Sequence, residues 1–429
     1  MRAPLIEKKH LVTFILITTL FALWGFANDI TNPMVAAFQT VMEIPASQAS
    51  MIQFAFYGGY FTMAIPAALF IRRYSYKKGI LLGLGLYAIG AFLFYPAAAC
   101  QSFVFFCFSL YILTFGLAFL ETTANPFILS LGARETSTRR LNLAQAFNPM
   151  GSLLGMTVAS QWILPALYSD RRDADGELLF SALSEAEKAQ IRLHDLAVIR
   201  DPYVMLGLVV MLVFLLIALR KMPSTALSAS SGSSMRETLQ RLWRNPIYVE
   251  GVVAQAFYVG AQIMVWTFII HYAERLGLDK AAAQRCNIIA MVLFLLSRFF
   301  GTFLMRYVNS RLLLAAFGAC AAMLTLGTVL LEDMRGLYCL MGVSAFMSLM
   351  FPTIYGIALE RVDERDTTLG AAFLVMAIVG GALMPPLQGW VIDQGTLMGH
   401  PAVNVSFMLP LVCFLVVLAY GLHVHRKRL

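Results

Sequence analysis

The stretch PYVMLGLVVMLVFLLIAL, at residues 202–219, decides the class of this protein because it contains no charged side chain. A helix needs about 20 mostly apolar residues to cross the hydrocarbon core of a bilayer. Outward from this stretch, comparable apolar segments recur along the whole chain, twelve in all. They lie at about 11–40, 47–71, 79–99, 103–132, 141–165, 202–222, 246–273, 281–305, 311–331, 336–359, 368–392 and 403–424. The sequence therefore predicts an all-α membrane protein with twelve transmembrane helices.

The composition agrees with a multi-pass membrane protein and excludes several soluble classes. Hydrophobic residues make up 59% of the 429 residues, and charged residues only 13%. An average soluble protein is about 25% charged, so an ordinary globular enzyme, a disordered protein and a disulfide scaffold are excluded. The net charge of +8 would suggest nucleic acid in a soluble protein, but in a membrane protein it is typical of basic cytoplasmic loops. We expect the lipid bilayer, and no nucleic acid, as a partner.

The distribution of Lys and Arg predicts the orientation of the chain. If the N-terminus lies inside the cell, 22 of the 32 Lys and Arg residues fall in inner segments and nine in outer loops. Cytoplasmic loops carry such an excess of basic residues. We therefore expect a multi-pass protein of the cell (inner) membrane with both termini in the cytoplasm.

A Ser-rich stretch at residues 224–235 indicates a flexible cytoplasmic linker between two sets of six segments. The predicted domains are an N-terminal six-helix bundle at 1–222, a linker at 223–245 and a C-terminal six-helix bundle at 246–429. In the long outer loop, residues 184–187 match a capping box that would open a short surface helix. Pro202 suits the first turn of the span that follows, so we expect two separate helices here.

The sequence contains no motif for catalysis or nucleotide hydrolysis. It has no phosphate-binding loop, no HExxH or GxSxG pattern and no Cys/His cluster. The six cysteines lie in or beside apolar runs without a CxxC pair, which indicates packing residues. We expect a protein that is not an enzyme and that binds no metal or cofactor, with any energy for transport taken from an ion gradient.

Three ionisable residues lie deep in predicted spans, namely Asp29, Glu121 and Arg298. Charge in the membrane is costly, so such residues are functional candidates by default. We favour proton-coupling roles for the two acids, because burial raises the pKa of a carboxyl group toward the neutral range that a proton carrier needs. Asp29 could instead cap a helix broken at Pro33, and Glu121 could form a fixed ion pair. Arg298 could be their counter-charge, or its side chain could reach the cytoplasmic surface.

Amide and aromatic side chains form a second set of candidates, for binding a hydroxyl-rich ligand. Amides offer both donors and acceptors, and aromatic rings offer a flat apolar face to a sugar. Asn32 shares a helix face with Asp29 because the two residues are three positions apart. The alternative for each residue is an interhelical hydrogen bond. The candidates for substrate binding are Trp24, Asn32, Asn125, Gln145, Asn148, Gln255, Tyr258, Gln262 and Trp266.

Five segments resemble the fucose permease type of the major facilitator superfamily. They are WGFAN at 24–28, QFAFYGGY at 53–60, LETTANPF at 120–127, RLNLAQAFN at 140–148 and YVGAQ at 258–262. The resemblance runs from about residue 12 to 420. It implies two six-helix bundles, a central sugar site, alternating access and proton coupling. It also implies a proton-coupling role for Glu121 and sugar-binding roles for Trp24, Gln145 and Asn148.

The chain departs from that family pattern in its first span. The pattern has asparagine at the position of Asp29 and the coupling aspartate at the position of Asn32, and this chain has the two reversed. One acid and one amide remain on the same helix face, about 4.5 Å apart along the axis. We infer that the coupling role lies with Asp29. In the tenth span, Phe351 stands where the pattern has tyrosine, so one hydroxyl is missing.

These observations predict a proton-coupled sugar importer that acts as a functional monomer, with L-fucose or a related hexose as substrate and the proton as coupling ion. A glucose/galactose or N-acetylhexosamine transporter of the same type is an alternative. An exporter of sugars or drugs is a further alternative, against which the number of amides argues. A non-transporting membrane sugar sensor is the last, although such sensors usually carry a long soluble domain.

Overall fold

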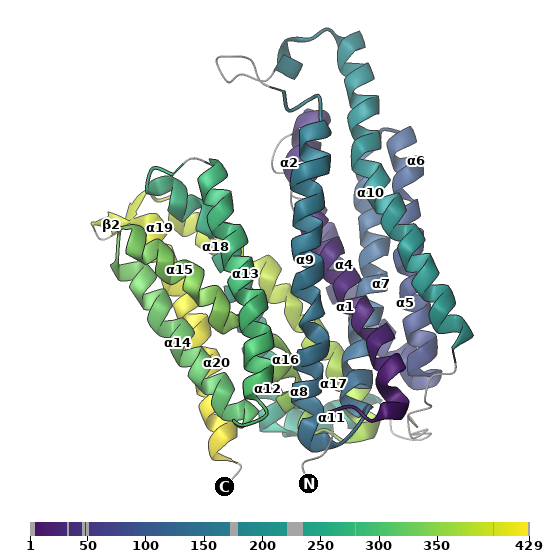
Figure 1. Ribbon diagram of the computed structural model, residues 1–429, viewed down its shortest axis with the longest axis vertical. Helices are drawn as coiled ribbons and strands as arrows, with labels where there is room; N and C mark the ends of the chain where they lie inside the picture. Colours follow the sequence, from purple (N-terminus) through teal and green to yellow (C-terminus); the bar gives the residue numbers. More distant parts are fainter. Residues whose placement is uncertain are drawn as a thin grey trace. The chain divides into compact units, whose positions relative to one another are not determined.

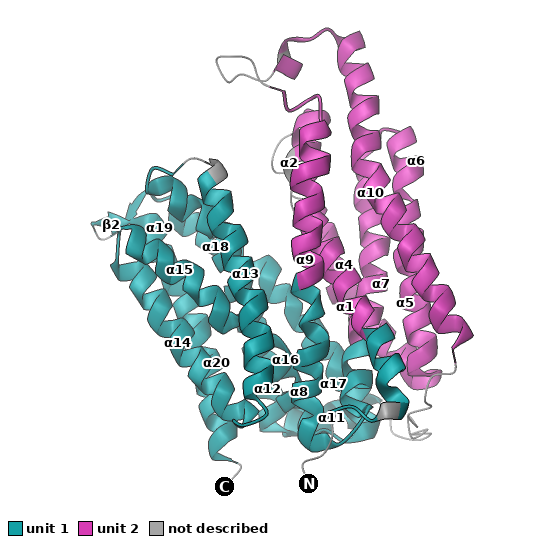
Figure 2. Ribbon diagram, in the orientation of Figure 1, with its two compact units in different colours: residues 1–17, 124–149, 224–429 teal, residues 18–123, 150–223 magenta. Residues whose placement is uncertain are grey.

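The computed structural model describes residues 5–31, 34–44, 48, 51–171, 179–220, 235–278, 280–397 and 399–427. Almost all of these residues are helical, as the apolar segments predict (Figure 1). The chain divides into two compact units, which we describe separately (Figure 2). Unit 1 contains residues 1–17, 124–149 and 224–429, and unit 2 contains residues 18–123 and 150–223.

Unit 2 is built from helices of the N-terminal half. Its elements are α1 (Leu11–Thr31, from Thr18 on), α2 (Met34–Val41), α4 (Met51–Arg73), α5 (Tyr76–Phe92), α6 (Phe94–Ala99), α7 (Phe103–Ser130, as far as Thr123), α9 (Phe147–Val158, from Met150 on), a π-helical turn (Ala159–Ile163), two 3-10 turns (Leu164–Ala166 and Leu179–Ala182) and α10 (Glu185–Leu219).

Unit 1 combines the C-terminal half with the ends of three N-terminal helices. Beside those ends of α1, α7 and α9 it contains 3-10 turns (Lys8–His10, Arg134–Thr136 and Ala377–Val379), α8 (Ser137–Gln145), α11 (Met235–Arg244), α12 (Pro246–Arg275), α13 (Lys280–Leu304), α14 (Ser310–Leu330), α15 (Met334–Met347), α16 (Met350–Glu360), α17 (Glu364–Met376), α18 (Gly380–Ile392), α19 (Ala402–Ser406), α20 (Met408–Arg426) and a hairpin of β1 (Thr396–Leu397) and β2 (His400–Pro401).

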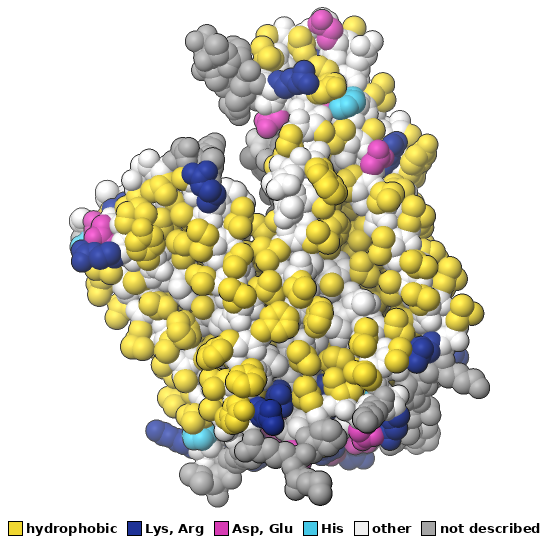
Figure 3. All heavy atoms as spheres, in the orientation of Figure 1, with side chains coloured by type: hydrophobic (Ala, Val, Ile, Leu, Met, Phe, Trp, Pro, Cys, Tyr) yellow, Lys and Arg dark blue, Asp and Glu magenta, His cyan; other side chains and the backbone are white. Residues whose placement is uncertain are grey.

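The helices account for all twelve predicted spans. Within the described ranges, eleven helical stretches are long and apolar enough to cross a membrane. The fifth predicted span is formed by α8 and α9, which are separated only by Ala146. Hydrophobic side chains cover the sides of the helices, and charged side chains gather toward their ends (Figure 3). This pattern is the one that a lipid environment requires.

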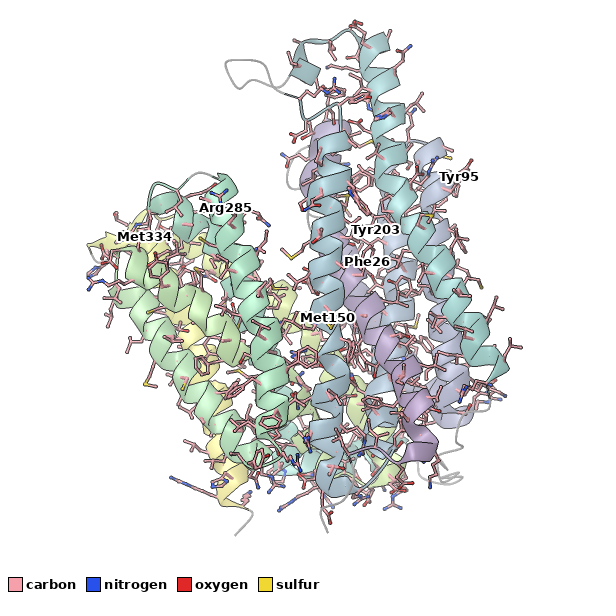
Figure 4. All side chains as sticks on the ribbon, in the orientation of Figure 1. Phe26, Tyr95, Met150, Tyr203, Arg285 and Met334 are labelled. Carbon is pink, nitrogen blue, oxygen red and sulfur yellow. The ribbon has the colours of Figure 1, made fainter. Side chains whose placement is uncertain are left out.

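Close helix contacts in unit 2 depend on small residues and buried aromatic rings. A Cβ atom at Gly155 in α9 would lie 2.7 Å from the carbonyl oxygen of Phe26 in α1, so only glycine lets these helices approach so closely. Tyr203 lies inside the unit, whereas Tyr95 lies at its edge (Figure 4). The Tyr203 hydroxyl is 2.9 Å from the Thr31 hydroxyl, and its ring stacks on Phe94 at 3.9 Å.

One prediction about the outer loop is confirmed and another is wrong. Ser184 and Glu187 form the expected capping box at the start of α10. However, α10 continues through Pro202 as a single helix of 35 residues and extends past its neighbours in unit 2 (Figure 1). A proline removes one backbone donor from a helix, and here the packing of α10 along α5 and α6 holds the helix together across that position.

The N-terminal end of α10 is held by charged contacts within unit 2. Lys188 and Arg192 both bond the carboxylate of Glu43, at 2.7 and 3.1 Å. Asp195 is fully buried and accepts hydrogen bonds from the backbone amides of Tyr168 and Ser169. These contacts explain why the helix persists beyond its apolar part.

In unit 1, buried charged residues fix helix ends. Arg140 is fully buried and donates to the carbonyls of Ile128 and Leu129, which are the last turn of α7 and have no partner of their own within the helix. Arg241 of α11 bonds both carboxylate oxygens of Asp366, at 2.7 and 2.9 Å, and this contact raises the pKa of Arg241. Residues near both ends of the chain lie at the same end of unit 1 (Figure 1).

Candidate functional site

The predicted site residues divide between the two units. Trp24, Asp29 and Glu121 lie in unit 2. Asn32 lies outside the described residues. The remaining candidates lie in unit 1, namely Asn125, Gln145, Asn148, Gln255, Tyr258, Gln262, Trp266 and Arg298.

The two candidate acids of unit 2 lie on α1 and α7 and are both buried. The exposed fraction is 8% for Asp29 and 3% for Glu121. Nδ2 of Asn28 lies 3.5 Å from Oδ2 of Asp29. Both α1 and α7 are apolar along most of their length, so ionised carboxylates here are poorly solvated. Buried carboxyl groups of this kind can gain and lose protons as their surroundings change.

The Trp24 ring packs in an aromatic cluster between α1 and α4. Its Nε1 donates to the hydroxyl of Tyr60 at 2.5 Å, and the two rings stack with their centroids 6.4 Å apart. The ring of Phe21 stacks on Trp24 from the same helix, at 5.8 Å. Because the indole N–H is already bonded, Trp24 can offer a ligand only its ring. Tyr60 belongs to this cluster and received no role from the sequence, although it lies in a segment that carries the resemblance.

Two amides of unit 1 form a direct pair. Nε2 of Gln145 in α8 donates to Oδ1 of Asn125 in α7, at 2.8 Å. The exposed fraction is 5% for Gln145 and 0% for Asn125. Nδ2 of Asn125 has no hydrogen-bond partner among the described residues. A buried donor without a partner is costly, and a hydroxyl-rich ligand would remove that cost. Asn148 follows the break after α8 and is half-buried.

Arg298 lies in α13 and its exposed fraction is 3%. Its Nε donates to the carbonyl of Ser348 at 2.5 Å, and its Nη1 donates to the carbonyl of Gln145 at 2.9 Å. The ring of Phe294 lies under the guanidinium, 4.6 Å from its carbon. Backbone carbonyls therefore hold the side chain inside unit 1. The alternative, in which the side chain reaches the surface, is wrong.

The four candidates on α12 differ in what their side chains bond. Tyr258 donates to the carbonyl of Met347 at 3.0 Å, and Trp266 donates to the hydroxyl of Ser344 at 3.3 Å, so both bond α15 as interhelical contacts. Gln262 is half-buried. Gln255 is fully buried, and neither its amide nitrogen nor its oxygen has a partner among the described residues.

The arrangement supplies two kinds of chemistry. Unit 2 holds buried carboxyl groups that can carry protons, and unit 1 holds amides that can bind hydroxyl groups. In the part of the chain that the structure describes, no three His, Cys, Asp or Glu residues are grouped as metal ligands would be. The six cysteines, all of them described, are free thiols.

Comparison with known proteins gives independent information on the family and the fold. Residues 15–385 match the sequence profile of the Major Facilitator Superfamily. The L-fucose-proton symporter of Haemophilus influenzae is 63% identical over 421 residues, which cover 98% of this chain and 98% of that protein. The L-fucose-proton symporter of Escherichia coli is 35% identical, over 97% of this chain and 93% of that protein.

A solved structure shares the fold over nearly the same length. The crystal structure of FucP, a Major Facilitator Superfamily transporter in the outward conformation, matches with a TM-score of 0.87 and 34% identity, over 97% of this chain and 99% of that chain. These matches confirm the resemblance and the twelve-helix fold that the sequence predicts, and they are to transporters rather than enzymes. The profile match and the identity along almost the whole length show that this protein belongs to the Major Facilitator Superfamily.

Proposed function

We propose that this protein is a proton-coupled symporter that imports L-fucose by alternating access. The observation that carries the proposal is the set of buried groups, with carboxylates at Asp29 and Glu121 and the amide pair of Asn125 and Gln145. The 63% identity to a protein named L-fucose-proton symporter supports the choice of sugar and ion.

Within this proposal each group has a separate task. Glu121 and Asp29 bind and release protons. The Asn125 and Gln145 amides bind sugar hydroxyls, together with Asn148, and Gln255 offers a further donor and acceptor that no described residue uses. Trp24 offers its ring to the sugar. Tyr258 and Trp266 act mainly as contacts between helices, because their polar atoms are bonded to α15. The roles of Asn32 and Gln262 rest on the sequence alone.

We also propose a location and a state of assembly. The protein is placed in the inner membrane with both termini in the cytoplasm, which is supported by the 22 basic residues in the inner segments. It acts as a monomer, and its coupling ion is the proton, without a cofactor.

Uptake by purified protein in liposomes tests the proposal. Labelled L-fucose, D-galactose, D-glucose and N-acetylglucosamine are supplied outside, with or without an acidic exterior. We expect L-fucose to accumulate above its external concentration only when the exterior is acidic, and a protonophore to abolish that accumulation. Accumulation of another sugar in place of L-fucose would reassign the substrate. Binding of sugar without any uptake would refute the transporter and favour a sensor.

A further inference from the structure

Two helix breaks in unit 1 have the same local cause. In an α-helix the carbonyl of residue i accepts from the N–H of residue i+4. The residue four after Gln145 is Pro149, and the residue four after Ser348 is Pro352. Proline has no N–H, so both carbonyls lose their helical donor. The chain breaks at these points, between α8 and α9 and between α15 and α16.

One side chain serves both of these carbonyls. Arg298 donates from Nη1 to the Gln145 carbonyl and from Nε to the Ser348 carbonyl. The guanidinium fork suits this task because its donors have fixed directions. A buried carbonyl without a donor would be costly. Arg298 therefore compensates two prolines on two different helices at once.

Gln145 links the bonds of Arg298 to the amide pair of Gln145 and Asn125. The Gln145 backbone that Arg298 holds carries the side chain that bonds Asn125 at 2.8 Å. The same face of α8 is attached at two more places, by Arg139 to the carbonyl of Thr302 and by Asn142 to the hydroxyl of Thr353. The direction of the Gln145 amide thus depends on how α8 ends.

We propose that Arg298 is a positioning residue for the ligand, which fixes the two proline breaks and so aims the Gln145 and Asn125 amides. The inference rests on the proposed function only in taking those amides as sugar ligands. It differs from the counter-charge role, in which a positive charge is sufficient. Here the fork is needed, because a single ammonium group cannot reproduce its two fixed donor directions toward carbonyls on two helices.

Arg298→Lys separates the two roles, because lysine keeps the charge and loses the fork. We expect the Kd for L-fucose to rise about five- to a hundred-fold, as for one unpaired buried group, with the midpoint of its pH dependence unchanged. Arg306→Lys, at the exposed end of the same segment, is the matched control and should leave the Kd unchanged. An Arg298→Lys Kd within twofold of the original, or a shifted pH midpoint, would overturn the proposal.

A second variant keeps the arginine and removes a proline. Pro149→Ala supplies an N–H to the Gln145 carbonyl, so the break closes and the amide is turned away from its ligand position. We expect weaker L-fucose binding by about fivefold or more. Pro66→Ala is the matched control, since Pro66 is an exposed proline inside α4. Unchanged binding in Pro149→Ala would contradict the proposal even if Arg298→Lys does not fold.

A thermal measurement makes the test independent of the sugar. Arg298→Lys should lower the Tm of the purified protein, and adding Pro149→Ala should restore part of it, because the carbonyl regains a donor. If the unsubstituted protein binds no L-fucose but this rescue of Tm still occurs, the proposed function fails while the role of Arg298 at the breaks stands. Equal losses of Tm with and without Pro149→Ala would refute that role.

Discussion

Glu121 lies in the middle of α7 with only 3% of its surface exposed. If it binds and releases one proton in each cycle, Glu121→Gln should abolish accumulation of sugar, because an amide cannot titrate. Exchange of labelled for unlabelled sugar across the membrane needs no net proton movement and should continue. The measurement is uptake and exchange in the same liposomes, with an acidic exterior for uptake.

Glu135→Gln is the matched control for this experiment. Glu135 lies in an exposed turn after α7, outside the apolar part of the helix, so its loss should leave accumulation unchanged. Full accumulation by Glu121→Gln would mean that the residue has a structural role, such as a fixed contact between helices.

Asp29 is the second candidate for proton coupling, and the family pattern suggests a test by exchange of positions. Asp29→Asn leaves the first span without an acid, so sugar-driven proton uptake should fail. The double change Asp29→Asn with Asn32→Asp restores the family pattern and should recover part of the proton uptake. The readout is alkalinisation of the medium when sugar is added to cells that express each variant. Proton movement retained in Asp29→Asn would leave Glu121 as the sole carrier.

At the residue scale, the sequence identified which side chains are buried but not what they bond. Charge and amide patterns were enough to select Asp29, Glu121 and Gln145, because such residues are rare in apolar segments. The partners of Arg298 could not be predicted, because they are backbone carbonyls, which every residue has. The prolines at 149 and 352 were the available signal, since each removes the donor for one carbonyl. Tyr60 likewise could not be matched with Trp24 without the packing of α1 against α4.

At the scale of helices, the contact between α8 and α16 can be tested by a cross-link. A Cβ atom at Gly356 in α16 would lie 3.3 Å from Cβ of Thr138 in α8, close to the separation of about 3.5–4.5 Å in disulfides. In a background without the native cysteines, Thr138→Cys with Gly356→Cys should therefore form a disulfide on oxidation. If α8 must leave α16 for sugar to be released inside, the oxidised protein should lose uptake.

The same protein after reduction is the control for this cross-link. Reduction should restore uptake, which separates the effect of the bond from that of the substitutions. If the oxidised and reduced forms take up sugar equally well, the contact between α8 and α16 does not open in the cycle.

The sequence predicted the number of helical segments better than their continuity. A long apolar run is enough to identify a span, and all twelve predicted spans are helical over most of their described residues. Whether a proline breaks a helix depends on packing around it. Pro202 was expected to start a helix, yet α10, which packs along α5 and α6, passes through it. Pro149 and Pro352 accompany breaks because Arg298 stabilises the broken form.

At the scale of the whole molecule, the orientation in the membrane can be tested directly. Single cysteines at either terminus or in residues 224–235, in the background without native cysteines, should be protected from an impermeant reagent added outside intact cells. A cysteine in residues 170–190 should be labelled. The physical reason is the retention of basic loops in the cytoplasm. Labelling of residue 230 from outside would reverse the orientation.

The chain is divided differently by its sequence, which shows a linker, and by its structure, which shows contacts between segments. The sequence predicts domains at 1–222 and 246–429 from a linker composition, and these boundaries remain a prediction. Grouping by contacts instead places residues 124–149 with the C-terminal half. The reason is visible in Asn142 and Gln145, which bond α16 and α13. A composition pattern cannot detect such contacts, since they join segments about 150 residues or more apart in sequence.

The length of α10 has a practical consequence for imaging. Its 35 residues correspond to about 52 Å, whereas the hydrocarbon core is about 30 Å thick, so about 20 Å of helix lies outside the hydrocarbon core. A protein of 47.5 kDa with short loops offers few features outside a detergent micelle for aligning particles in electron cryomicroscopy. Because this end is continuous with a spanning helix and held by Glu43 and Asp195, an antibody fragment bound to it would move with unit 2 and mark its position in each image.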